Sequence, residues 1–109
     1  MKKYKYLRLA IEDSTKTDMA APIQLALPFI REGLERDEAV LVHCDKGASR
    51  SATIVLAYLK NYSDESVNFI HKRMTVDECI NWLQKIRSVV NPNEGFRRQL
   101  SIFYDTEEV

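Results

Sequence analysis

The alternation of hydrophobic and polar positions predicts two strands and a helix in the first part of the chain. Residues 4–11 alternate well enough for a strand, and an unbroken apolar run at 40–42 is typical of a strand buried on both faces. Between them, residues 19–35 carry apolar side chains at helical spacing, although Pro28 should kink or interrupt that helix. This order predicts a right-handed β-α-β unit.

The rest of the chain predicts three more helices. One begins at Ser51, directly after the second strand. Another begins at Thr75, because Thr75 and Glu78 have the spacing of a capping box. The last follows a turn at 91–95 and has an apolar face that includes Phe96. Together these elements predict the α/β class, with a small parallel sheet flanked by helices.

Composition narrows the class of protein. The chain has 109 residues, which we expect to form one domain (1–109). Its formal net charge is zero, so neither nucleic acid nor an anionic membrane is expected as a partner. No apolar run reaches membrane-spanning length, and two cysteines without framework spacing indicate a reducing compartment. We therefore expect an intracellular protein, cytoplasmic or nuclear.

Candidate chemistry lies between the second strand and the helix at Ser51. Loop N–H groups and the helix dipole form an anion-binding cradle there. Cys44 stands at its mouth, where such surroundings favour the thiolate over the thiol. Arg50 can donate two N–H groups to a tetrahedral oxyanion, and the Ser51 hydroxyl can stabilise the sulfur as a leaving group. A nucleophile beside a bound anion predicts catalysis.

Residues 43–51 resemble the His-Cys-x5-Arg-Ser/Thr signature of the cysteine-based protein phosphatases, and most closely that of the dual-specificity branch. The resemblance implies an α/β fold and attack of Cys44 on phosphorus, with His43 in support and no metal or cofactor. It also implies a phosphate-binding loop made of Asp45, Lys46, Gly47, Ala48, Ser49 and Arg50. The pair Asp45-Lys46 stands where small or apolar residues are common, and we expect Asp45 to point outward and Lys46 to lie at the rim.

A proton donor for the leaving group is expected in the polar loop at 12–18. The carboxyl ends of parallel strands meet at one edge of a sheet, so this loop should lie near Cys44. Two carboxylates are candidates, Asp13 and Asp18. The run Glu12-Asp13-Ser14 resembles the acid-bearing loop of the dual-specificity branch, which implies the general-acid role for Asp13. Asp18 is then the expected N-cap of the following helix.

A second resemblance covers residues 92–100. The dual-specificity branch carries Pro-Asn-x-Gly-Phe-x-x-Gln-Leu before its last helix, and this chain has that motif in full. The resemblance implies that Asn93 supports the site through a hydrogen bond to a neighbouring loop. Cys79, by contrast, falls on an apolar helix face and is expected to be a core residue.

The chain departs from the family at its N-terminus, where relatives carry further strands and a helix. Two parallel strands with a bare edge are marginal and prone to pairing. The natural protein could be longer, another subunit could cover the edge in a homo-oligomer, or helices could cover the gap.

The leading functional hypothesis is a phosphatase that hydrolyses phosphotyrosine and phosphoserine/threonine in proteins through a cysteinyl-phosphate. A phospholipid or RNA-end phosphatase is an alternative, which the basic Lys46 favours. A non-catalytic phosphate-binding module is another, because a weakened sheet could misplace Asp13. Sulfur transfer and arsenate reduction also use a loop cysteine, but the x5 spacing and Asp13 fit a phosphatase better. The sequence does not distinguish tyrosine-only from dual specificity.

Overall fold

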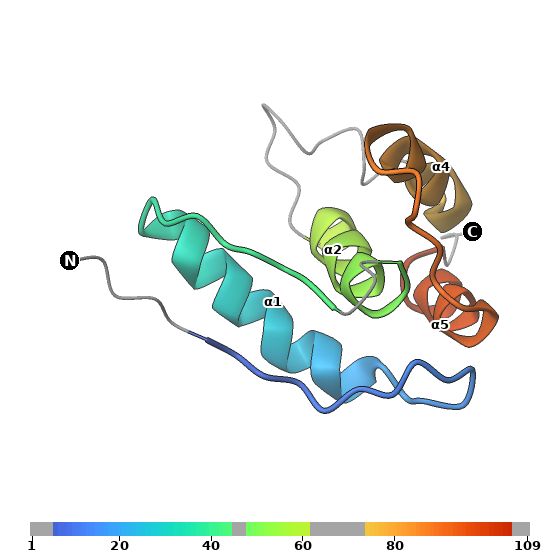
Figure 1. The fold of residues 1–109 in the computed structure, drawn as a ribbon, viewed down its shortest axis with the longest axis horizontal. Helices are drawn as coiled ribbons and strands as arrows, with labels where there is room; N and C mark the ends of the chain where they lie inside the picture. Colours follow the sequence, from blue (N-terminus) through green and yellow to red (C-terminus); the bar gives the residue numbers. More distant parts are fainter. Residues whose placement is uncertain (1–5, 45–47, 62–73, 106–109) are drawn as a thin grey trace.

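The structure is a computed structural model that describes residues 6–44, 48–61 and 74–105. Over these ranges the chain forms four helices and no strand (Figure 1). The helices are α1 (Ala20–Glu35), α2 (Arg50–Asn61), α4 (Val76–Ile86) and α5 (Glu94–Tyr104). The predicted helices are therefore present, whereas the predicted parallel sheet is not confirmed.

The two segments predicted as strands keep the expected connectivity without pairing. Figure 1 shows residues 6–11 and 38–44 running in the same direction along α1, which runs the opposite way between them in the chain. A strand ladder requires backbones about 4.8 Å apart. Here a groove lined by both segments lies between them, so no ladder forms over the described residues.

The start of α1 differs from the prediction at one residue. The N-cap position is taken by Met19, not by Asp18. Asp18 nevertheless contributes to the helix start, since its Oδ1 accepts a hydrogen bond from the backbone N–H of Ala20 at 2.9 Å. The helix thus begins at Ala20, one residue later than expected, and the Met19 side chain at the N-cap is fully buried.

Pro28 lies inside α1 and does not interrupt it, whereas the alternative prediction of a kink at Pro28 stays a prediction. Proline leaves the carbonyl of Gln24, four residues earlier, without its helical donor. Both Gln24 and Pro28 are exposed, which lets solvent satisfy that carbonyl. The buried face of the helix, which includes Ile23 and Ile30, holds the two halves together.

A tight turn returns the chain from α1 to the second extended segment. Asp37 adopts a left-handed conformation with φ of 59°, which aspartate tolerates better than most residues. The N–H of Glu38 donates to the carbonyl of Gly33 at 2.9 Å. A Cβ added at Gly33 would lie 2.8 Å from Val40 Cγ2, so the glycine permits close packing of this segment on α1.

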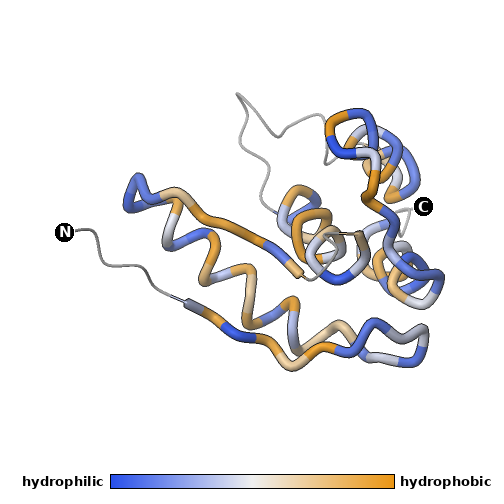
Figure 2. The backbone as a smooth tube through the Cα atoms, in the orientation of Figure 1, coloured by the Kyte–Doolittle hydropathy of each residue, from blue (hydrophilic) through white to orange (hydrophobic). Residues whose placement is uncertain are grey.

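The four helices share one apolar core, and the tube in Figure 2 shows hydrophobic stretches on each of them. α1 packs on α2, α2 on α5, and α4 on both α2 and α5. Cys79, Ile80, Phe96 and Leu100 are fully buried, so the predicted core position of Cys79 is confirmed. Burial raises the pKa of the Cys79 thiol, which keeps it protonated and unreactive.

The predicted start of α4 is confirmed in detail. Glu78 N donates to Thr75 Oγ1 and Thr75 N donates to Glu78 Oε1, each over 3.1 Å, which is a complete capping box. The buried Lys60 at the end of α2 donates from Nζ to the carbonyl of Met74, just before this box. Within the described part of the chain, no helix has the length and apolar character to cross a membrane.

Candidate functional site

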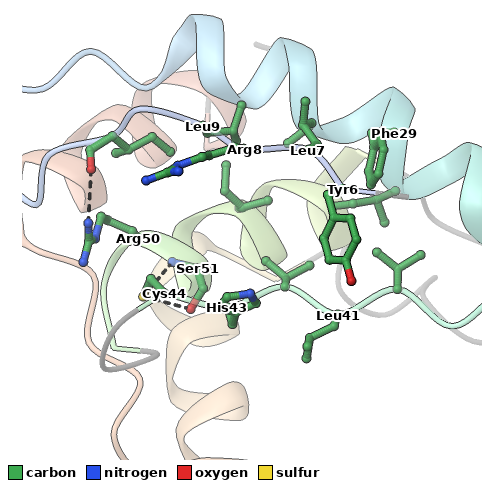
Figure 3. A pocket seen from close by; sticks show the side chains of 16 residues that line it. Tyr6, Leu7, Arg8, Leu9, Phe29, Leu41, His43, Cys44, Arg50 and Ser51 are labelled. Atoms are coloured by element: carbon green, nitrogen blue, oxygen red, sulfur yellow. Dashed lines mark hydrogen bonds between the residues drawn. The ribbon is translucent and has the colours of Figure 1, made fainter. Parts of the chain in front are cut away.

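Cys44 and Ser51 lie together where the second extended segment meets α2 (Figure 3). The backbone N–H of Ser51 donates to Cys44 Sγ at 3.4 Å. The Cys44 thiol donates to Ser51 Oγ at 3.3 Å, and the same distance would let the hydroxyl donate to a thiolate. The sulfur therefore lies within hydrogen-bonding distance of both the backbone N–H and the hydroxyl of Ser51, at the N-terminus of α2.

Part of the predicted phosphate-binding loop lies outside the described residues, namely Asp45, Lys46 and Gly47, so the expected orientations of Asp45 and Lys46 stay predictions. The described end of the loop is firmly held. Ser49 is buried, and its carbonyl accepts from both the backbone N–H and the hydroxyl of Thr53, at 3.0 and 2.7 Å. The Ala48 carbonyl accepts from the backbone N–H of Asn91.

Arg50 joins this loop to the first extended segment. It is the first residue of α2, and its Nη1 donates to the carbonyl of Ile11 at 3.2 Å (Figure 3). Ile11 lies two positions before Asp13. The guanidinium thus holds the start of the loop at 12–18, which carries both candidate acids, beside the helix that carries Ser51.

The structure separates the two candidate acids. Asp13 is exposed, and its Oδ1 accepts a hydrogen bond from Asn93 Nδ2 at 2.8 Å. Asn93 in turn donates from its backbone N–H to Ser49 Oγ at 2.8 Å. Asp13 is therefore tied, through one residue, to the loop that ends at Arg50. Asp18 is instead engaged at the start of α1.

The motif at 92–100 holds the loop at 12–18 in place through more contacts than the one made by Asn93. Gln99 Nε2 donates to the Thr17 carbonyl, and Gln99 Oε1 accepts from the backbone N–H of Met19, both over 2.7 Å. A Cβ added at Gly95 would lie 2.0 Å from the Thr15 carbonyl oxygen, so only glycine allows the loop to approach α5 this closely. These roles of Gln99 and Gly95 were missed from the sequence, although the motif itself was the available signal.

His43 is exposed and lines the groove between the two extended segments, adjacent to Cys44 in the chain. Its supporting role stays a prediction. Among the described residues, no cluster of histidine, cysteine and carboxylate side chains could hold a metal ion. The groups that the described residues bring to the site are the Cys44 thiol at a helix N-terminus, the Arg50 guanidinium, and the Asp13 carboxylate, which Asn93 holds. Such a set suits nucleophilic attack on an oxyanion followed by proton transfer.

Comparison with known proteins agrees with this arrangement. Residues 1–106 match the family model of the dual specificity phosphatase catalytic domain, and the chain therefore belongs to that family. The phosphatase domain of Yvh1 from Chaetomium thermophilum superposes with a TM-score of 0.73 at 32% identity, over 93% of this chain and 66% of that one. The fold is accordingly that of a dual-specificity phosphatase domain.

Curated relatives show the same likeness over part of their length. The 123R protein of Invertebrate iridescent virus 6 is 37% identical over 93 residues, which is 85% of this chain and 59% of that protein. Dual specificity protein phosphatase PHS1 of Arabidopsis thaliana is 37% identical over 89% of this chain and 10% of its own length. Dual specificity protein phosphatase 1 of Mus musculus is 35% identical over 92% of this chain and 25% of its own length. The chain thus spans less than two thirds of each.

Proposed function

We propose that this chain is a catalytic domain that hydrolyses phosphate monoesters of tyrosine and of serine or threonine in proteins. The observation that carries the proposal is the Cys44–Ser51 pair at the N-terminus of α2, with Arg50 at the family's spacing. Membership of the dual specificity phosphatase family supports it. Residues 1–109 act as one domain in this proposal, with the segments at 6–11 and 40–44 as the positions of its strands.

In the first step the Cys44 thiolate attacks phosphorus and the bond from phosphorus to the leaving oxygen breaks. Asp13 gives its proton to that oxygen, so the alcohol or phenol leaves neutral. The amides of the loop at 45–50 and the Arg50 guanidinium hold the equatorial oxygens, whose charge is spread in the transition state. The product of this step is a cysteinyl-phosphate.

In the second step a water molecule attacks the cysteinyl-phosphate. The Asp13 carboxylate takes a proton from the water, the sulfur–phosphorus bond breaks, and inorganic phosphate departs. The Ser51 hydroxyl donates to the departing thiolate, which the 3.3 Å separation of Oγ and Sγ allows. No metal or cofactor takes part in this scheme.

The test is hydrolysis of para-nitrophenyl phosphate by the 109-residue chain between pH 5 and 8. The Cys44→Ser variant should lose turnover by roughly 10⁴-fold or more, the scale typical when an enzyme's nucleophile is removed. Cys79→Ala is the matched control, since it removes the other cysteine, which is fully buried, and should keep its activity. Circular dichroism checks that each variant folds.

Two outcomes would reject the proposal. Turnover that survives in Cys44→Ser would exclude the cysteinyl-phosphate. A folded wild-type chain that binds orthovanadate or phosphate without turnover would favour a non-catalytic phosphate-binding module.

A further inference from the structure

The loop at 12–18 lies against one face of α5 (Figure 1). Gly95 and Gln99 are four residues apart, so they lie on the same face of that helix. Gly95 admits the backbone of Thr15, whereas Gln99 contacts the last residues before α1 through both ends of its amide. The side chain of Gln99 thus joins the end of the loop to the start of α1.

The amide of Gln99 makes one hydrogen bond on each side of Asp18. Its Nε2 donates to the carbonyl of Thr17, and its Oε1 accepts from the backbone N–H of Met19, both over 2.7 Å. Met19 is fully buried. Because a backbone group withdrawn from water is costly to leave without a partner, one side chain that satisfies two such groups holds the backbone firmly at this point.

Hydrogen bonds within the loop connect its end to the candidate acid. The backbone N–H of Thr17 donates to the Ser14 carbonyl at 3.1 Å, and the N–H of Ser14 donates to the Glu12 carbonyl at 2.9 Å. Asp13 stands between Glu12 and Ser14 in the chain. A displacement of Thr17 is therefore passed on to the backbone of Asp13, because the two turns share Ser14 and move together.

We propose that Gln99 is a positioning residue for proton transfer by Asp13, and that its bond to the Thr17 carbonyl carries this role. The inference rests on the function proposed above. Gln99 acts through the backbone of the loop, whereas Asn93 holds the carboxylate of Asp13 directly. The other bond of Gln99, from Met19, fixes the start of α1 and has no part in the chemistry.

This role predicts a loss that is confined to substrates in need of the acid. Phenolate leaves slowly unless Asp13 protonates it, whereas para-nitrophenolate needs little protonation. Gln99→Met removes both hydrogen bonds and keeps a side chain of similar length. It should lower kcat with phenyl phosphate by about tenfold or more, since a misplacement of roughly 1 Å can cost 10²-fold. With para-nitrophenyl phosphate the loss should stay below about threefold, and KM should change little for either substrate.

Gln99→Glu separates the two ends of the amide. It keeps an acceptor for the N–H of Met19 but removes the donor to Thr17, because the new carboxyl is ionised at pH 7. It should therefore show the same selective loss with phenyl phosphate, and it keeps the proposal testable where Gln99→Met does not fold. A wild-type ratio of the two rates in Gln99→Glu would contradict the role of the Thr17 bond.

Gln84→Met on α4 is the matched control. Gln84 is half-buried like Gln99, and its Nε2 donates to a loop carbonyl, that of Val90, at 2.8 Å. The same substitution thus removes a comparable hydrogen bond in a different loop. Any change in rate should then be equal for the two substrates, and circular dichroism with thermal unfolding checks that each variant is folded.

The sharpest measurement combines Gln99→Met with Asp13→Asn. Once the acid is absent, its position no longer matters, so Gln99→Met should slow phenyl phosphate hydrolysis by less than about twofold in this background. A further loss of about tenfold in the double variant would show that Gln99 acts on something other than Asp13, and would overturn the proposal. Equal slowing of both substrates by Gln99→Met alone would overturn it as well.

The failure of this inference differs from the failure of the proposed function. A folded wild-type chain without turnover that depends on Cys44 would reject the function and the inference together. An unchanged ratio of the two rates, or an additive double variant, would reject only the role of Gln99 and leave the phosphatase function intact.

Discussion

Asn93 Nδ2 donates a hydrogen bond to Asp13 Oδ1 over 2.8 Å, although the two residues are eighty positions apart. The same asparagine caps α5, since its Oδ1 accepts from the backbone N–H of Phe96 at 2.9 Å. Its own N–H donates to Ser49 Oγ at 2.8 Å. One residue therefore links the loop at 12–18, the predicted phosphate-binding loop and α5.

Replacement of Asn93 should separate these roles. Asn93→Ser keeps a good N-cap but removes the donor to Asp13, whereas Asn93→Ala removes both. We expect each variant to slow hydrolysis of phenyl phosphate roughly tenfold to hundredfold, because Asp13 loses its position. Only Asn93→Ala should also lose about 1 kcal/mol of stability in urea unfolding. Normal rates with Asn93→Ser would show that the Asp13 contact has no part in catalysis.

The dependence of the rate on the leaving group can show whether Asp13 or Asp18 is the general acid. Asp13→Asn should lower the rate with phenyl phosphate by about 10² to 10⁴, and much less with para-nitrophenyl phosphate, whose leaving group needs little protonation. Asp18→Asn is the matched control, because asparagine can still accept the bond from Ala20. If Asp18→Asn shows the leaving-group dependence instead, the acid is wrongly assigned.

Ser51 should act chiefly in the second chemical step. In Ser51→Ala the backbone donor to Cys44 Sγ remains, at 3.4 Å, but the hydroxyl at 3.3 Å is lost. Removal of one such donor costs about 10² to 10³ in rate. Rapid-mixing experiments with para-nitrophenyl phosphate should show a burst of one equivalent of para-nitrophenol, followed by slow turnover.

A suitable control for that experiment is Ser101→Ala on α5, at a position outside the groove and the phosphate-binding loop. It should show wild-type kinetics. Slower turnover of Ser51→Ala without a burst would mean that the first step, not the breakdown of the cysteinyl-phosphate, depends on the hydroxyl.

The sequence predicted correctly those contacts whose residues lie close together in the chain. The capping box at Thr75 and Glu78 formed as predicted, because its donors and acceptors are three residues apart. Cys44 and Ser51 also meet as their spacing predicts, because the loop between them spans only six residues. The predicted parallel sheet is not confirmed over the described residues, since a period of two specifies strand-like segments but not the partner that each requires.

Contacts between segments far apart in the sequence were predicted only from the motif at 92–100, or were not predicted at all. The link from Asn93 to Asp13 was anticipated only as a hydrogen bond to a neighbouring loop, on the resemblance alone. Gln99 holds both Thr17 and Met19, yet nothing in its own surroundings in the sequence indicates this. Such contacts depend on how α5 lies against the loop that precedes α1, which periodicity does not encode.

The buried thiol of Cys79 predicts a pH dependence of stability on the alkaline side. Burial raises the pKa of this thiol, and the nearby Lys60 partly opposes that effect, whereas Asp105 and Glu78 reinforce it. The folded state therefore holds the proton more tightly than the unfolded state, in which the pKa is about 8.5. The stabilisation is complete below that value and is lost as the pH rises through the folded-state pKa.

Urea unfolding of wild type and Cys79→Ala at pH 7.0, 8.5 and 9.5, under reducing conditions, tests this dependence. We expect Cys79→Ala to be less stable at pH 7.0, by about 1 kcal/mol or more, because a buried sulfur is lost. The difference should shrink as the pH rises, by at most about 1.4 kcal/mol per pH unit, since one proton is involved. Other alkaline titrations are common to both proteins and cancel in the difference. A difference that stays constant from pH 7.0 to 9.5 would show that the Cys79 thiol is not linked to folding.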